Sequence, residues 1–139
     1  MNADVLFFDT NVLVYLFDED EPRKQAIARA LLRDSTDIRL STQVLAEFYV
    51  TVTRKLARPL KPETAYQAVE ELRAFPVAVP TPQRILQAIR RSIDARISFW
   101  DGLIVETALA DGANCLVSED LQDGWQIGAM RVWNPFSAT

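Results

Sequence analysis

The stretch "VLFFDTNVLVY", residues 5–15, runs through a block of apolar residues to a single carboxylate, Asp9. The apolar run 5–8 predicts a buried strand, and residues 11–17 continue with a spacing that suits a helix. A carboxylate at the end of a buried strand costs free energy unless another group pairs with it. Because the chain contains no histidine, the partner of Asp9 must be another encoded group or a bound cation.

Strand-like and helix-like segments alternate along the rest of the chain. The pattern predicts short strands at 37–42, 76–82, 115–118 and 131–133, and helices up to 34 and over 43–56, 62–74, 82–96 and 99–111. This alternation, with continuously apolar strands, favours an α/β fold in which helices cover both faces of a parallel sheet. The strand at 76–82, "PVAVPTP", is fenced by prolines, which predicts an edge position.

Length and composition restrict the class of protein. A chain of 139 residues is the size of one domain, so we expect a single domain over 1–139. A net charge of −4 argues against a protein that holds nucleic acid by bulk electrostatics alone. It does not exclude a protein that binds phosphates through bound cations and a local basic patch. The single Cys115 excludes an intrachain disulfide and indicates a reducing compartment. With no signal peptide and no membrane span expected, the predicted location is the cytoplasm.

Acidic side chains follow several of the predicted strands. In open parallel sheets, functional sites form outside the carboxyl ends of the strands. The polar groups expected there are Asp9, Glu47, Asp101, Ser118 and Asp120. Several carboxylates at one edge, with no histidine to neutralise them, favour a hard divalent cation, Mg²⁺ or Mn²⁺. A zinc site is disfavoured because the chain has no histidine and one cysteine.

Three of these acids also have an ordinary structural interpretation. Asp101 lies three residues after Ser98, as in a helix capping box. Glu47 is equally typical of a solvated helix position, and Asp120 of a turn in "SEDL". Asp9 has no comparable alternative, because it directly ends a buried strand.

Four segments in order along the chain resemble the motifs of PIN-domain ribonucleases. They are "FFDTNVLVYLFD", "STQVLAEFYV", "SFWDGLIVETAL" and "LVSEDLQDG", the last followed by "VWNPF". The likeness extends from about residue 4 to 136 and is strongest to the VapC-type toxins of prokaryotic toxin–antitoxin pairs. Taken together, the order and spacing of the four segments are more specific for this family than any single segment.

The resemblance implies a set of site residues. The acidic quartet of the family would fall on Asp9, Glu47, Asp101 and Asp120. Two supporting positions carry over as Asn11, expected to help hold the first acid, and Ser118, near the last. Gly102, where alanine is common, and Glu106 depart from the family pattern without touching the quartet.

The resemblance also implies a fold and an activity. The fold would be a three-layer α/β/α arrangement around a parallel sheet in the order 3-2-1-4-5. The activity would be hydrolysis of RNA phosphodiester bonds, dependent on Mg²⁺ or Mn²⁺ held by the quartet. The implied partners are an RNA substrate, a small antitoxin protein and a second copy of the chain in a homodimer.

Basic and aromatic residues could help to hold RNA. Candidates for phosphate attraction are Arg84, Arg90, Arg91 and Arg96, or Arg54, Lys55 and Arg58, and Trp100 could stack a base. Each of these also suits an ordinary solvated or packed position.

Two other classes of α/β protein with an acid after the first strand do not fit the same residues. An aspartyl phosphatase would want Asp-x-Asp after the first strand, where this chain has Asn11, and a phospho-acceptor receiver would want an acidic pair there. The remaining alternatives are a catalytically silent PIN module used for binding and a housekeeping PIN nuclease without an antitoxin.

Overall fold

A six-stranded sheet forms the centre of the computed structural model, which describes residues 4–137. The strands lie in the order β3-β2-β1-β4-β6-β5. They are β1 (Leu6–Phe8), β2 (Ile38–Ser41), β3 (Val77–Ala78), β4 (Cys115–Val117), β5 (Gln126–Ile127) and β6 (Met130–Trp133). All neighbouring strands are parallel except β5 and β6, which are antiparallel.

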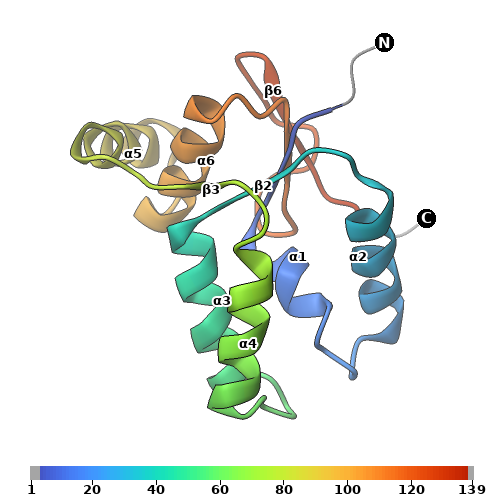
Figure 1. Cartoon of the computed structure of the whole chain (residues 1–139). Coiled ribbons are helices and arrows are strands. Elements are labelled where there is room, and N and C mark those ends of the chain that lie inside the picture. Colours follow the sequence, from blue (N-terminus) through green and yellow to red (C-terminus); the bar gives the residue numbers. More distant parts are fainter. Residues whose placement is uncertain (1–3, 138–139) are drawn as a thin grey trace.

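Helices flank this sheet, as Figure 1 shows. They are α1 (Thr10–Tyr15), α2 (Pro22–Asp34), α3 (Thr42–Arg54), α4 (Pro62–Leu72), α5 (Pro82–Ala95) and α6 (Phe99–Ala110). α5 and α6 pack on each other to one side, whereas α1 contacts both α2 and α3, and α3 contacts α4. Within residues 4–137 no helix has the length and apolar character needed to cross a bilayer. The α/β class, with helices around a mostly parallel sheet, is the class expected.

The buried strand predicted from the opening stretch is the centre of the sheet. β1 pairs on one side with β2, where Leu6 faces Ile38, and on the other with β4, where Phe8 faces Val117. Phe7 and Phe8 are fully buried, one on each face, because successive side chains of a strand point to opposite sides. This burial explains why the run is continuously apolar, and it carries Asp9 to the carboxyl end of the central strand.

The order 3-2-1-4-5 holds for the five predicted strands, with 131–133 observed as β6 in the last of those places. The prediction of a wholly parallel five-stranded sheet was wrong at one edge, where β5 lies outside β6. A tight hairpin joins them, with Ile127 opposite Met130, and Gly128 has the positive φ of 58° that such a loop requires. β3 is the other edge strand and pairs only with β2, as its flanking prolines predicted.

Gly102 marks an unusually close approach between α5 and α6. A Cβ atom at this position would lie 2.7 Å from the backbone oxygen of Ala88, closer than real Cβ contacts allow. Ala88 and Gly102 are both buried in this contact. The small residue at 102, noted as a departure from the family pattern, therefore has a packing reason.

Candidate active site

Asp9 is the most buried acid of the site, with an exposed fraction of 5%. It caps the N-terminus of α1, and its Oδ1 accepts a hydrogen bond from the Thr10 backbone N–H at 2.7 Å. Its Oδ2 accepts a second bond from the Ser118 hydroxyl, also at 2.7 Å. Both carboxylate oxygens are thus fixed by neutral donors, which hold the side chain in one place without cancelling its charge.

Ser118 connects Asp9 to the loop after β4. Its hydroxyl oxygen accepts a hydrogen bond from the Asp120 backbone N–H at 3.1 Å, in addition to donating to Asp9. Asn11 contributes from α1, where its Oδ1 accepts from the Glu119 backbone N–H at 3.4 Å. Asn11 was expected to help hold the first acid; its hydrogen bond goes to this loop, and Ser118 supplies the side-chain bond to Asp9.

Glu119 lies between Ser118 and Asp120 but is held away from them. Its Oε2 is 2.6 Å from Lys24 Nζ on α2, and its Oε1 accepts a hydrogen bond from the Tyr15 hydroxyl on α1. Burial and the Glu119 hydrogen bond raise the pKa of Tyr15, so the phenol keeps its proton. The contacts with Lys24 and Tyr15 fasten the loop that carries Asp120.

Glu47 projects from α3 with both carboxylate oxygens hydrogen-bonded. The Thr10 hydroxyl donates to Oε1 at 2.8 Å, and the Gln43 side-chain amide donates to Oε2 at 3.2 Å. Neither Thr10 nor Gln43 was predicted from the sequence as a site residue. The only hint in the sequence was the position of each residue. Thr10 is next to Asp9, and Gln43 lies one helical turn before Glu47.

Asp101 lies in the first turn of α6. The Ser98 hydroxyl caps this helix by accepting from the Asp101 backbone N–H at 3.0 Å, so this half of the proposed capping box is present. Partial burial is the main cause that raises the pKa of Asp101, and the negative charges of Asp120 and Glu47 add to it. Asp101 is therefore both a cap position and a member of the charged group.

We call the four acids Asp9, Glu47, Asp101 and Asp120 the acid cluster, because charges within this set act on Asp9 and on Asp101. Burial raises the pKa of Asp9 to about 6, with further contributions from the charges of Asp120 and Asp101 and an opposing effect of the Ser118 and Thr10 hydrogen bonds. None of the ion pairs among residues 4–137 includes a member of the cluster. The cluster therefore carries negative charge that no side chain in this part of the chain compensates.

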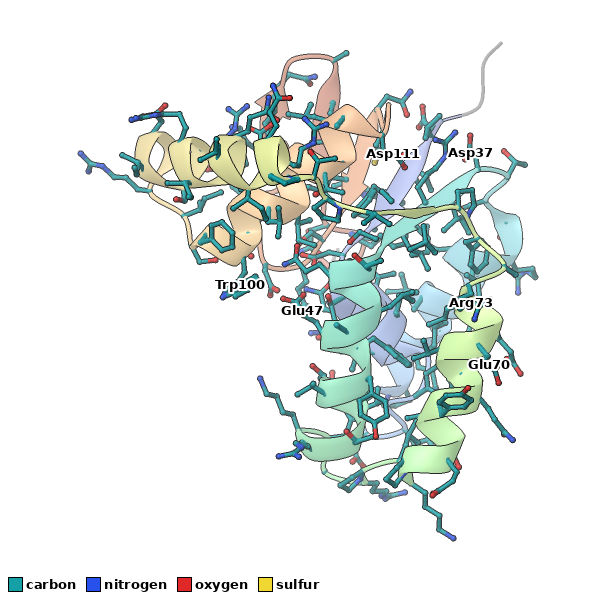
Figure 2. All side chains as sticks on the ribbon, turned by 60° about the vertical axis from the view of Figure 1, so that its left-hand side comes forward. Asp37, Glu47, Glu70, Arg73, Trp100 and Asp111 are labelled. Carbon is teal, nitrogen blue, oxygen red and sulfur yellow. The ribbon has the colours of Figure 1, made fainter. Side chains whose placement is uncertain are left out.

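A groove of about 1070 Å³ opens beside the acid cluster. Its polar lining includes Thr10, Asn11, Gln43, Glu47 and Asp120, and its apolar lining includes Val50, Val79, Ile85, Trp100 and Leu103. Figure 2 shows Glu47 on α3 and Trp100 on α6 pointing into the same opening between the two helices. Trp100 has an exposed fraction of 59% and lies next to Asp101, so a large aromatic surface stands at the edge of the cluster.

Most of the basic residues considered for phosphate binding face elsewhere. Arg91 pairs with Glu106 at 2.8 Å and ties α5 to α6. Arg58 lies within 4 Å of Glu19 and Asp20. Among the lining residues of the groove, Lys55 is the basic one.

The donor set of the acid cluster fits a hard divalent cation in its chemistry. All four side chains offer carboxylate oxygens, the ligands that Mg²⁺ and Mn²⁺ prefer, and their charge is uncompensated. Within residues 4–137, however, no three acidic, cysteine or histidine side chains converge closely enough to form a finished metal site. Of the four side chains, Asp9 is fixed by its two hydrogen bonds, whereas Asp101 is half-buried and Asp120 is exposed.

Comparison with known proteins gives one family match. Residues 6–122 match the model of the PIN domain. No curated protein matches the chain. Among solved structures, FitAB bound to a DNA fragment aligns over 97% of this chain and 98% of its own, with a TM-score of 0.71 and 20% identity.

Two further structures have a similar fold. VapC20 of Mycobacterium tuberculosis, described as a toxin that cleaves the sarcin–ricin loop, aligns over 80% of this chain and 86% of its own, with a TM-score of 0.66 and 20% identity. DNA-bound VapBC of Salmonella typhimurium aligns over 92% and 96%, with a TM-score of 0.64 and 19% identity.

Proposed function

The chain belongs to the PIN domain family, and from this premise we propose that it is a metal-dependent endoribonuclease, the toxin of a toxin–antitoxin pair. One observation carries the proposal. Four carboxylates without an ion-pair partner in the described residues lie at the carboxyl ends of the parallel strands, beside an open groove. A module used only for binding has no physical need to keep mutually repelling acids together, so this observation favours the enzyme over the silent module.

The members of the acid cluster have different roles in this proposal. Asp9 and Asp101 are the first choice of direct metal ligands, with Glu47 and Asp120 completing the set. When bound, Mg²⁺ or Mn²⁺ would stabilise negative charge on the phosphate and lower the pKa of a water molecule. Thr10 and Ser118 keep Asp9 fixed through its two hydrogen bonds, so one ligand is preorganised.

The groove has the chemistry to hold an RNA strand next to the acid cluster. Lys55 offers a positive charge to a phosphate, and the exposed face of Trp100 offers a stacking surface to a base. No histidine is needed as a general base where a metal ion lowers the pKa of the attacking water.

Cleavage that depends on the metal ion is the direct test of this function. We expect the purified chain to cut RNA in Mg²⁺ or Mn²⁺, to leave 5′-phosphate and 3′-hydroxyl ends, and to be inactive in excess EDTA. Gel analysis of a labelled RNA, with metal added back after EDTA, measures all three. Full cleavage in EDTA would contradict the metal-dependent mechanism.

The solved structures that share this fold suggest which partners to propose. Several of them are VapBC or toxin–antitoxin complexes, and we propose that a small antitoxin covers the groove of this chain. We also propose a homodimer, because Leu86, Ile89 and Ile93 form an exposed apolar stripe along α5 that association would cover.

Expression in bacteria tests the toxin role separately from the chemistry. We expect the chain alone to arrest growth, and co-expression with the product of a short neighbouring gene to restore growth and to yield a complex that no longer cuts RNA. Growth curves and co-purification measure this. Harmless overexpression with no small partner recovered, together with metal-dependent cleavage, would instead indicate a housekeeping PIN nuclease.

A further inference from the structure

One side chain joins the two helices that carry Glu47 and Asp101. The Gln43 amide nitrogen on α3 donates to the backbone oxygen of Trp100 in the first turn of α6 at 3.1 Å, and to Glu47 Oε2 at 3.2 Å. Within residues 4–137 this is the one hydrogen bond between α3 and α6. It crosses the groove at the point where Figure 2 shows Glu47 and Trp100 converging.

The orientation of the Gln43 amide indicates that these two contacts hold it. Its Oε1 is buried and has no hydrogen-bond partner in the described residues. A buried acceptor without a partner costs free energy. Both partners of the amide are oxygen acceptors, so only its NH₂ group can face them, and this fixes which way the amide lies.

The chemistry of glutamine suits this position. The link brings together two elements that carry like charges, and the charge of Glu47 acts on Asp101. A lysine in place of Gln43 could also donate to Glu47, but its positive charge would neutralise the carboxylate and repel a metal ion. A neutral donor holds Glu47 and leaves its negative charge for the cation.

We propose that Gln43 is a positioning residue that sets the separation of Glu47 and Asp101 across the groove, and thereby the affinity of the acid cluster for a divalent cation. The proposal rests on the metal-dependent function proposed above. Gln43 acts through Glu47 and the first turn of α6, and it is not itself a ligand in this scheme.

Binding of Mn²⁺ to the protein without RNA tests the proposal. Gln43→Met keeps the length of the side chain and removes its donors, and we expect it to weaken Mn²⁺ binding by about 10-fold or more, as loss of a group that orients a ligand does in other metal sites. Electron paramagnetic resonance of free Mn²⁺ gives the dissociation constant. We expect cleavage by Gln43→Met to need correspondingly more Mn²⁺ and to recover when Mn²⁺ is saturating.

Gln67→Met is the matched control, because Gln67 is an exposed glutamine on α4 outside the groove. It should bind Mn²⁺ as the wild type does. If Gln43→Met also binds like the wild type, or only lowers the melting temperature without changing the Mn²⁺ dependence, the proposal is overturned and Gln43 is merely structural. If the wild type binds no Mn²⁺, the metal-dependent function fails and this proposal fails with it, a result distinct from the first.

Discussion

Asp9→Asn is expected to lower the single-turnover rate of RNA cleavage by more than about 100-fold, equivalent to about 2.7 kcal/mol of transition-state stabilisation. Asparagine has nearly the same shape, and its Oδ1 can still accept the Thr10 N–H bond that caps α1. The substitution therefore removes the negative charge and largely keeps the local structure. Asp101→Asn should have an effect of similar size, because the Ser98 cap bonds the backbone of residue 101 rather than its carboxylate.

A matched control for these two variants is Asp94→Asn. Asp94 is exposed on α5 and forms a surface pair with Arg90 at 3.9 Å, a contact that contributes little to stability. Quench-flow or gel assays at saturating Mn²⁺ should give the wild-type rate for Asp94→Asn. Full activity of Asp9→Asn in a folded sample would remove Asp9 from the catalytic machinery and return the acid cluster to a structural role.

The second large effect concerns the stability of the metal-free protein. The Asp9 carboxyl has a pKa of about 6 in the folded chain, compared with an ordinary value of 3.8, mainly because it is buried. The folded state thus binds the proton more tightly than the unfolded state. Stability from this group is fully present below about pH 4 and is lost as the pH rises through about 6, a change of roughly 3 kcal/mol.

Comparison of wild type with Asp9→Asn isolates this contribution from the other titrating groups. We expect Asp9→Asn to unfold at higher urea concentration than wild type at pH 7.5 in EDTA, and the difference to shrink or reverse at pH 4. Mg²⁺ should raise the wild-type midpoint at pH 7.5, because it binds only the folded state. Urea titrations at the two pH values, with and without Mg²⁺, measure these effects.

Asp37→Asn provides a control of the opposite sign. A hydrogen bond from Arg39 lowers the pKa of Asp37, so its carboxylate adds stability above the unfolded pKa, and this is lost as the pH falls. We expect Asp37→Asn to be destabilised at pH 7.5. If Asp9→Asn also unfolds at a lower urea concentration than wild type at pH 7.5 in EDTA, the hydrogen bonds of Asp9 stabilise the fold more than its buried charge destabilises it. The acid cluster would then not be a source of strain in the metal-free protein.

The core of the fold follows from local patterns in the sequence. The apolar run before Asp9 predicted a buried strand, and the prolines around 76–82 predicted the edge position of β3. β5 was missed because each arm of its hairpin is short, and two residues, Gln126 and Ile127, cannot display the alternation that identifies a strand. The one sequence signal for this hairpin was Gly128, a glycine between two apolar residues.

Less of the candidate site could be predicted from the sequence. Asp9 was identified because a carboxylate directly after a buried strand has no ordinary explanation. Glu47 and Asp120 depended on the family resemblance, since a helix glutamate and a turn aspartate are common anywhere. Thr10 and Gln43 are neutral polar residues, and their importance appears only when the three-dimensional structure shows which carboxylate each one faces.

The tight contact of Gly102 with the backbone of Ala88 has a mechanical consequence. With no room for even a methyl group between them, α5 and α6 cannot slide past each other and must move as one rigid body. Asp101 and Trp100 travel with that body, whereas Glu47 belongs to the packed group of α1, α3 and α4. Asp101 and Trp100 therefore keep a fixed position relative to α5, and any change in the width of the groove between α3 and α6 moves both of them together relative to Glu47.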